Sequence, residues 1–288
     1  MFSKKVSESS LVAYQNVSES LHSKTVSIES RNSNLIMKTN RLVLLRHGES
    51  EFNLRNLFCG WHDAPLSASG LEEARTIAAA NLIAAKLVFD KVYCSTLSRS
   101  KRSAEVILSE MKCSFLPTVS DWRLNERHYG NLTGANKRDM ANRYGEEQVQ
   151  FWRRNYDGLP PPIETSNKYF YHICNNPAFQ AVPIDQFPLT ESMRMCVDRV
   201  SPVWSEIRKE VLEGIRVLIV VHGTVTRALV KHIEGLSEEQ IEKVNIPNSV
   251  PIVYEFNMKT GELIGGSKYL GDAKYIEKMT EKVAGIGN

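Results

Sequence analysis

Two short apolar runs in the chain each lead directly into a His-Gly pair. The runs at 41–46 and 216–222 are too short for buried helices and rich in branched side chains, so they predict strands buried on both faces. His47 follows the first strand, and His222 ends the second. Because open α/β sheets bind ligands at the carboxyl ends of their strands, this pattern predicts two imidazoles at one edge of a sheet.

The other apolar positions alternate between helical and extended spacing. Helical spacing predicts helices at 70–86, 97–111, 136–154, 193–211 and 225–234, and a capping box at Ser237 opens one more. Short apolar runs predict strands at 88–95, 115–119, 252–256 and 262–269, the last two as a hairpin turned near 259–261. Residues 163–189 are aromatic and lack a clear period, and so long a loop is usually functional or mobile. The alternation predicts an α/β fold with a mostly parallel sheet.

The two ends of the chain differ from its centre. Residues 1–40 contain ten serines and little periodicity, so we expect a disordered extension. A mitochondrial transit peptide is the minority interpretation, because this segment holds three glutamates and such peptides are poor in acids. We expect one folded domain over 41–275, without an interdomain linker, and a flexible tail at 276–288.

Charge and composition exclude several classes of function. The formal charge is +3, and residues 1–40 supply +2 of it (five Lys and Arg against three Glu), so the rest of the chain carries about +1. A near-neutral body argues against nucleic-acid binding, and any strong anion site must be a local concentration of Arg and Lys. No apolar run reaches membrane-spanning length. Five cysteines without a zinc or CxxC pattern favour a reducing compartment, so we expect a cytoplasmic protein.

His47 is the candidate nucleophile. A neutral imidazole attacks phosphorus readily, and the substrate oxygens must then be held by arginines or by amides at a helix N-terminus. Arg46 and Arg99 are candidates for the first role, and the Gly223-Thr224 segment before a predicted helix for the second. Either histidine alone is more often a satisfied core residue, but two in the same setting favour the functional interpretation. Zinc or iron on the two histidines and Glu126 is disfavoured, because no metal-ligand spacing supports it.

A charged stretch at 124–130 supplies a candidate proton carrier. Phosphoryl transfer to or from a hydroxyl needs a general acid/base, and Glu126 is the candidate; a solvated surface glutamate is the alternative. Arg153 and Arg154 can bind a carboxylate or second phosphate by forked hydrogen bonds, although such a pair alone is more often an exposed helix face.

With these residues assembled, the chain resembles the cofactor-dependent phosphoglycerate mutases of the histidine phosphatase superfamily, from about residue 41 to 273. The resemblance is carried by RHGESEFN at 46–53, GWHD at 60–63, LNERHYGNLTG at 124–134, WRR at 152–154 and KHIEGLS at 231–237. The Arg-His-Gly motif alone marks only the superfamily. The LNERHYG run at 124–130 and the WRR triplet at 152–154 narrow the resemblance to the mutase branch.

The resemblance implies a three-layer α/β/α sandwich and a catalytic domain over 41–275. It implies that His47 is phosphorylated, that Arg46, Arg99 and His222 stabilise the transfer, and that Glu126 is the acid/base. Phosphoglycerate would be held by Asn53, Cys59, Gly60, Tyr129, Lys137, Arg153, Arg154, Gly223 and Thr224. The implied reaction interconverts 3-phosphoglycerate and 2-phosphoglycerate, with 2,3-bisphosphoglycerate as primer and no metal, in a homodimer.

Three positions refine this interpretation. The sister bisphosphoglycerate mutases carry Gly where this chain has Ser50 and Ser where it has Gly60, so a glycolytic mutase is preferred. The family usually has Asn where this chain has Thr224, which is shorter and puts efficiency in doubt. A phosphatase on the same scaffold and a divergent, low-activity paralogue with a binding role therefore remain alternatives.

Overall fold

The computed structural model describes residues 38–286, and a single six-stranded sheet forms the centre of the body that begins at Thr39. The strands are β1 (Thr39–Arg46), β2 (Lys91–Cys94), β3 (Thr118–Ser120), β4 (Val217–Val221), β5 (Ile252–Asn257) and β6 (Lys268–Tyr269). Their order is β3-β2-β4-β1-β5-β6; β1 to β4 are mutually parallel, and β5 and β6 add an antiparallel edge. The predicted α/β fold with a mostly parallel sheet is confirmed.

The register of the two central strands brings the histidines together. Strands β1 and β4 are adjacent and parallel, with Arg46 opposite Val221. The next residues, His47 and His222, therefore leave the sheet side by side, and the backbone N–H of His47 donates to the carbonyl of Val221 at 2.9 Å. The predicted meeting of the two imidazoles at one sheet edge follows directly from this pairing.

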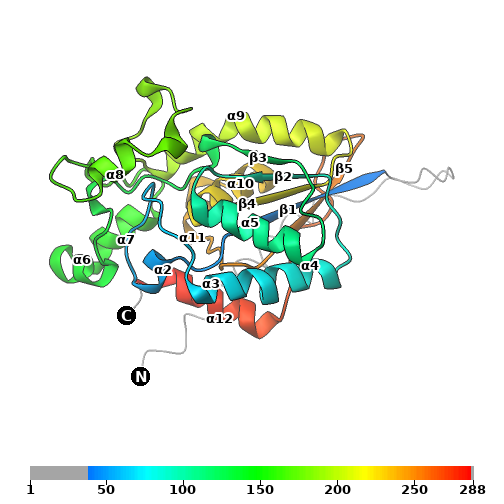
Figure 1. Cartoon of the computed structure of the whole chain (residues 1–288), viewed down its shortest axis with the longest axis horizontal. Coiled ribbons are helices and arrows are strands. Elements are labelled where there is room, and N and C mark those ends of the chain that lie inside the picture. Colours follow the sequence, from blue (N-terminus) through cyan, green and yellow to red (C-terminus); the bar gives the residue numbers. More distant parts are fainter. Residues whose placement is uncertain (1–37, 287–288) are drawn as a thin grey trace. The chain divides into compact units, whose positions relative to one another are not determined.

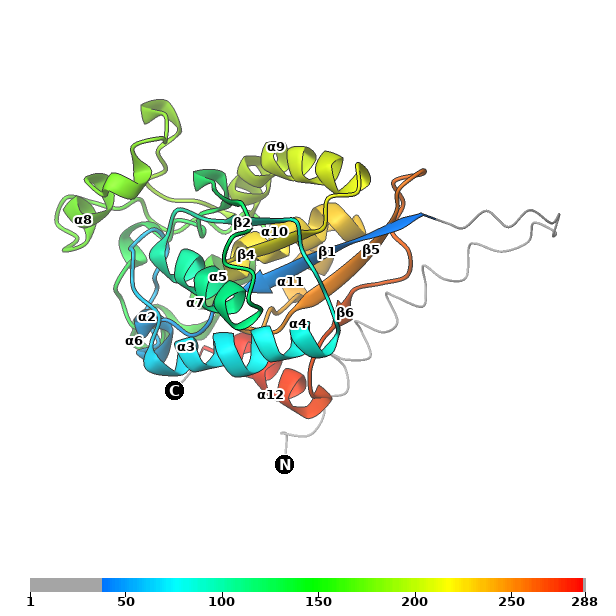
Figure 2. The same ribbon diagram turned by 45° about the vertical axis from the view of Figure 1, so that its right-hand side comes forward.

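Helices cover both faces of the sheet (Figures 1 and 2). They are α2 (Glu51–Leu54), α3 (Ala68–Glu73), α4 (Ala80–Ala84), α5 (Ser98–Glu110), α6 (Lys137–Tyr144), α7 (Glu146–Arg154), α8 (Phe170–Cys174), α9 (Met193–Leu212), α10 (Gly223–Glu234), α11 (Glu238–Lys243) and α12 (Ala273–Ala284). A π-helical segment, Ala74–Ala79, joins α3 to α4, so these pieces form the one helix predicted at 70–86. Helices α9 and α10 lie on one face, and the α3–α4 unit with α5 lies on the other.

Side-chain alternation along the strands explains the three layers. Val43 and Leu45 of β1 and Leu218 and Val220 of β4 pack against α5 and the α3–α4 unit in one buried apolar cluster. The intervening residues of both strands point to the opposite face and are also fully buried. Strands without a polar face are typical of a sheet covered on both sides.

Some predicted elements are shorter or divided. The helix predicted at 136–154 breaks at Gly145, whose backbone lies at φ 87°, a conformation that glycine adopts without steric cost. The strand predicted at 262–269 is reduced to β6 and a single bridge between Phe256 and Leu263. The turn predicted near 259–261 does form, and in it the N–H of Gly261 donates to the carbonyl of Asn257. The aperiodic segment 163–189 forms α8 and two 3₁₀ turns, and its apolar side chains pack around Trp61.

The structure corrects the expectation of a flexible tail at 276–288. Helix α12 runs to Ala284, begins with Asp272 capping the N–H of Tyr275, and lies beside α3 in both views. Within the described residues, Ile286 beyond its end is buried against Phe58 and Trp152. Of the disordered extension predicted at 1–40, residues 1–37 lie outside the described part of the chain. Its last two residues, Thr39 and Asn40, belong to β1. No helix between residues 38 and 286 is long and apolar enough to span a membrane.

Candidate active site

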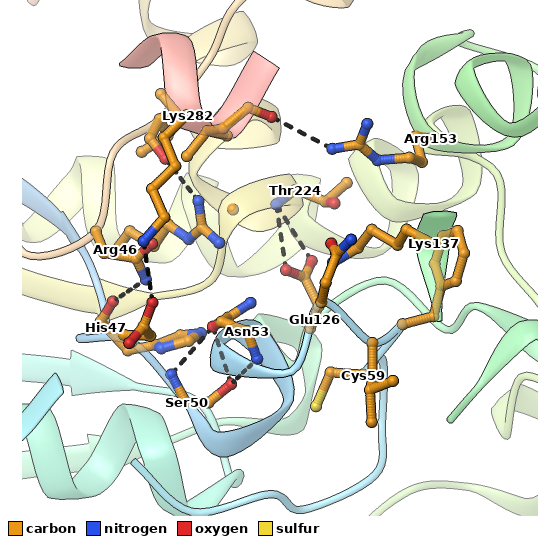
Figure 3. A pocket seen from close by; sticks show the side chains of 18 of the residues that line it. Arg46, His47, Ser50, Asn53, Cys59, Glu126, Lys137, Arg153, Thr224 and Lys282 are labelled. Atoms are coloured by element: carbon orange, nitrogen blue, oxygen red, sulfur yellow. Dashed lines mark hydrogen bonds and ion pairs between the residues drawn. The ribbon is translucent and has the colours of Figure 1, made fainter. Parts of the chain in front are cut away.

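A pocket of about 290 Å³ opens at the carboxyl ends of β1 and β4 (Figure 3). All but one of the site residues predicted from the sequence line it: Arg46, His47, Asn53, Cys59, Gly60, Arg99, Glu126, Tyr129, Lys137, Arg153, Arg154, Gly223 and Thr224. The exception, His222, lies fully buried beside His47, with the two ring centroids 4.9 Å apart. The structure therefore assembles in one place residues that the sequence spreads from Arg46 to Thr224.

Local contacts set the state of His47. Its Nδ1 lies 2.6 Å from the carbonyl oxygen of Gly48, which can only accept, so Nδ1 carries the proton and Nε2 keeps its lone pair in the neutral ring. Burial, and then the charges of Arg99 and Arg46, hold the pKa of His47 well below 6.5. The neutral tautomer with a bare Nε2 is the form that attacks phosphorus.

The loop after His47 is held by close backbone packing. A Cβ on Gly48 would overlap the carbonyl oxygen of Gly70 in α3, and a Cβ on Gly70 would overlap the backbone of Glu49. The N–H of Gly48 donates to Ser103 of α5, and Asn248 donates to the carbonyl of His47 at 2.7 Å. These contacts fix the backbone of His47 and Gly48 from three sides.

His222 presents one nitrogen as a candidate donor. Its Nε2 lies 2.7 Å from the hydroxyl of Ser95, which also accepts from the N–H of Leu97. A serine proton directed to Nε2 leaves the proton of neutral His222 on Nδ1, which has no hydrogen-bond partner between residues 38 and 286. Burial, and then Arg99, hold the pKa of His222 well below 6.5. A neutral N–H donor in the ring that lies beside His47 suits a phosphoryl oxygen.

Two arginines flank the histidines. Arg46 donates through one terminal nitrogen to the carbonyl of Ile246, while its buried Nε has no partner within the described part of the chain. Arg99 is 1% exposed and donates to the carbonyls of Gly60 and His62 at 2.8 and 2.9 Å. Both guanidinium groups are thus oriented before any anion arrives, which reduces the cost of reorganisation during the reaction.

Glu126 faces the start of helix α10. One carboxylate oxygen accepts from the N–H of Arg127 at 2.8 Å and from the N–H of Thr224 at 3.2 Å (Figure 3). Thr224 belongs to the first turn of α10, where unpaired amides favour negative charge. The carboxylate is therefore held in the wall of the pocket that His47 also lines, where it is the candidate proton carrier.

Lys137, Arg153 and Arg154 form a second group of cations. Figure 3 shows Lys137 and Arg153 across the pocket from His47. Burial and, to a smaller extent, the charge of Arg153 lower the pKa of Lys137 to about 7. Burial and, to a smaller extent, the charge of Arg227 hold the pKa of Arg154 well below 12.5. Half-buried like charges repel one another, and an anion between them would offset this repulsion, so this group is a candidate second anion site.

The remaining predicted residues complete the pocket wall. Asn53 is fixed by a capping box with Ser50 at the start of α2. The centre of the Tyr129 ring lies 4.7 Å from the guanidinium of Arg127. Burial raises the pKa of the phenol, but the charges of Arg127 and Arg153 and a hydrogen bond from Arg127 together lower it below its usual value. Burial raises the pKa of the Cys59 thiol, which donates to the carbonyl of His62.

Sequence reasoning missed several residues of the pocket. From α12 and the residues after it come Met279, Lys282, Val283, Gly285 and Ile286. The carbonyl of Val283 accepts from Arg153 at 3.3 Å and from Arg154 at 2.6 Å, and Lys282 pairs with Glu49 at 3.2 Å. The spacing of Tyr275, Met279 and Val283 would have indicated this helix. In total the pocket is lined by seven Arg and Lys side chains and two Glu, so the local concentration of cations expected for an anion site is present.

Comparison with known proteins places this geometry in a family. In structure the chain is similar to a putative alpha-ribazole-5'-P phosphatase from Escherichia coli (22% identity, TM-score 0.58, 81% of this chain and 97% of that chain covered). It is also similar to the alpha-ribazole phosphatase from Shigella flexneri (23%, 0.56, 81% and 96%) and to a mycobacterial glucosyl-3-phosphoglycerate phosphatase (19%, 0.58, 81% and 97%). At these identities the likeness shows the shared fold. The family model for the histidine phosphatase superfamily (branch 1) matches residues 42–172 and 174–264, and the chain therefore belongs to that superfamily.

Proposed function

We propose that this protein is a phosphoglycerate mutase that acts through a phosphohistidine on His47. The observation that carries the proposal is the second cation group of Lys137, Arg153 and Arg154, in the same pocket as His47. A substrate with a phosphate at His47 and a carboxylate or second phosphate at these cations fits this arrangement. A simple phosphomonoester would leave the second group without an anion.

The transfer can be written with the residues of the pocket. Nε2 of His47 attacks phosphorus, an N–P bond forms, and the P–O bond to the substrate carbon breaks. Glu126 gives its proton to the leaving alkoxide, while Arg46, Arg99 and Nδ1 of His222 donate to the equatorial oxygens. In the return step, which comes first when the primer has already phosphorylated His47, Glu126 takes the proton of the free hydroxyl of the bound phosphoglycerate. The oxygen of that hydroxyl attacks phosphorus as the N–P bond breaks, which gives the bisphosphorylated intermediate that the first reaction then resolves.

The residues present also fit the primer that the mutase branch uses. The buried Nε of Arg46 and Nδ1 of His222 lack partners among residues 38–286, and the second cation group lies across the pocket, so both ends of a bisphosphate would find donors. Bound there, 2,3-bisphosphoglycerate supplies the phosphoryl group that loads His47. The same cations keep the partly transferred substrate in place between the two half-reactions.

A phosphatase is the second candidate function. The solved structures named above are described as phosphatases, and Thr224 replaces the asparagine usual in the mutase branch. Water would then take the place of the second hydroxyl in the return step.

One assay separates the two candidates. The protein is given excess 3-phosphoglycerate, with and without 2,3-bisphosphoglycerate, and 2-phosphoglycerate and free phosphate are measured together. We expect 2-phosphoglycerate to form faster than free phosphate and to depend on the primer. Phosphate release that exceeds 2-phosphoglycerate formation would replace the mutase by the phosphatase.

A further inference from the structure

The most buried of the ion pairs found in residues 38–286 lies outside the pocket. Glu191 and Arg199 have side chains only 3% and 8% exposed, and neither lines the cavity. Glu191 precedes the N-cap of α9, and Arg199 lies two turns along that helix. The contact is a forked pair, with Nε to one carboxylate oxygen at 2.7 Å and a terminal nitrogen to the other at 2.9 Å.

Both members of the pair also bind the loop that carries Glu126. Arg199 donates to the carbonyl of Arg123 at 2.8 Å and, at 3.4 Å, to the carbonyl of Glu126 itself. Glu191 accepts from the N–H of His128 at 2.8 Å, and its own N–H donates to the carbonyl of His128 at 2.8 Å. The pair therefore holds the main chain before, at and after Glu126.

The loop needs such contacts because it has little regular structure of its own. After the 3₁₀ turn Trp122–Leu124 the chain is irregular as far as Gly130. Asn125 adds one tether, accepting from the N–H and hydroxyl of Thr96. A buried ion pair is a costly way to gain stability compared with apolar packing, whereas its directional fork suits the placement of a backbone.

We propose that Glu191 and Arg199 are positioning residues that aim the carboxylate of Glu126 into the pocket by fixing the backbone on both sides of it. The proposal rests on the proposed function only in so far as Glu126 is the proton carrier. It applies equally to a mutase and to a phosphatase, because both expel an alkoxide that needs a proton.

The test compares two leaving groups. Alkyl phosphates such as 3-phosphoglycerate and glycerol 2-phosphate release alkoxides that need a proton from Glu126, whereas p-nitrophenyl phosphate releases a phenolate that leaves without one. Arg199→Lys keeps the charge and loses the fork, and Glu191→Gln keeps the shape and loses the charge. Glu126→Gln and His47→Ala are the reference variants for the loss of the proton carrier and of the nucleophile.

We expect both positioning variants to lower kcat for the alkyl phosphates at least about tenfold. This loss is smaller than the full contribution of general acid catalysis, because Glu126 is still present but less well placed. Their kcat for p-nitrophenyl phosphate is expected to stay within threefold of the parent, as for Glu126→Gln, and their KM values to change little. The matched control is Arg216→Lys, which breaks another forked pair, with Asp90, at the start of β4. This control is expected to leave both substrates unaffected.

The outcomes are distinguishable. Equal losses on both kinds of substrate, or no loss on either, would overturn the positioning role. If Arg199→Lys does not fold, as judged by its circular dichroism, Glu191→Gln alone provides the test. The quantity compared is again the ratio of kcat for the alkyl phosphate to kcat for p-nitrophenyl phosphate. If the parent fails on 3-phosphoglycerate but cleaves glycerol 2-phosphate, the proposed mutase function fails, while the ratio for glycerol 2-phosphate still tests the pair.

Discussion

The imidazole rings of His47 and His222 lie edge to face, with their centroids 4.9 Å apart. Each ring has one nitrogen tied, to Gly48 and to Ser95 respectively, and burial holds the pKa of both rings well below 6.5. Two neutral rings at this distance do not repel each other, so one can act as nucleophile while the other donates. Both rings are therefore neutral at pH 7.

Replacing His47 by Ala removes the attacking nitrogen, so we expect no phosphorylated protein and no turnover above the assay background. Intact-mass measurement after incubation with 2,3-bisphosphoglycerate would show an acid-labile gain of one phosphoryl group on the parent and none on the variant. His172→Ala, at an exposed histidine of α8, serves as the control and should keep both. A labelled His47→Ala protein would mean that the phosphoryl group is carried elsewhere.

The pKa of Lys137 gives the pH dependence of substrate binding a direction. Its pKa is lowered to about 7, so Lys137 is an ammonium below pH 7 and loses its charge above it. An anionic substrate prefers the charged form, and we expect KM for 3-phosphoglycerate to rise above about pH 7, by at most about tenfold per pH unit for one linked proton.

Lys137→Arg keeps its charge through this range and is the matched comparison. Steady-state KM values between pH 6 and 9 should stay flat for the arginine variant relative to the parent. Identical profiles for the two proteins would show that Lys137 does not contact the substrate.

Thr224→Asn restores a longer hydrogen-bond donor at the start of α10. Thr224 is 4% exposed and lines the pocket, and its backbone N–H already donates to the carboxylate of Glu126. One added hydrogen bond to a charged group contributes about 1.5 kcal/mol, so we expect kcat/KM for 3-phosphoglycerate to rise about tenfold. Thr224→Val, which lacks the hydroxyl, should fall below the parent. An unchanged kcat/KM in both variants would remove this position from the site.

Stopping the chain after Asp272 removes α12 and with it the carbonyl of Val283, which holds both Arg153 and Arg154. We expect kcat/KM to fall about tenfold or more, the equivalent of losing one charge-assisted hydrogen bond. No residue within α12 is buried, so Tm should drop only by roughly 5 °C, mostly from the lost burial of Ile286.

Calorimetry and steady-state kinetics on the truncated protein would check both parts. Lys278→Met, at an exposed position of the same helix, is the control for a surface change and should alter neither quantity. Full activity after truncation would show that the two arginines keep their positions without α12.

The sequence predicted the centre of the molecule better than its rim. Residues 42–45 and 217–221 are fully buried. Their apolar runs therefore admitted one interpretation, and the placement of His47 and His222 followed from it. Gly145 was harder, because a single glycine within a helical pattern either persists or breaks the helix, and only its observed φ decides. Asn248 reaches His47 across 201 positions of sequence, a contact that no local pattern encodes.

The backbone contact between Gly48 and Gly70 limits which sequences this site can explore. An added methyl at either position meets main chain rather than a movable side chain, so no second substitution nearby can make room for it. In a library of single substitutions selected only for folding, we expect no variant at Gly48 or Gly70 to be recovered. At Gly145 an added Cβ would meet nothing within 4 Å, so residues that tolerate positive φ, such as asparagine, should survive there. The backbone packing at Gly48 and Gly70 therefore requires glycine at both positions, whatever reaction the pocket around them performs.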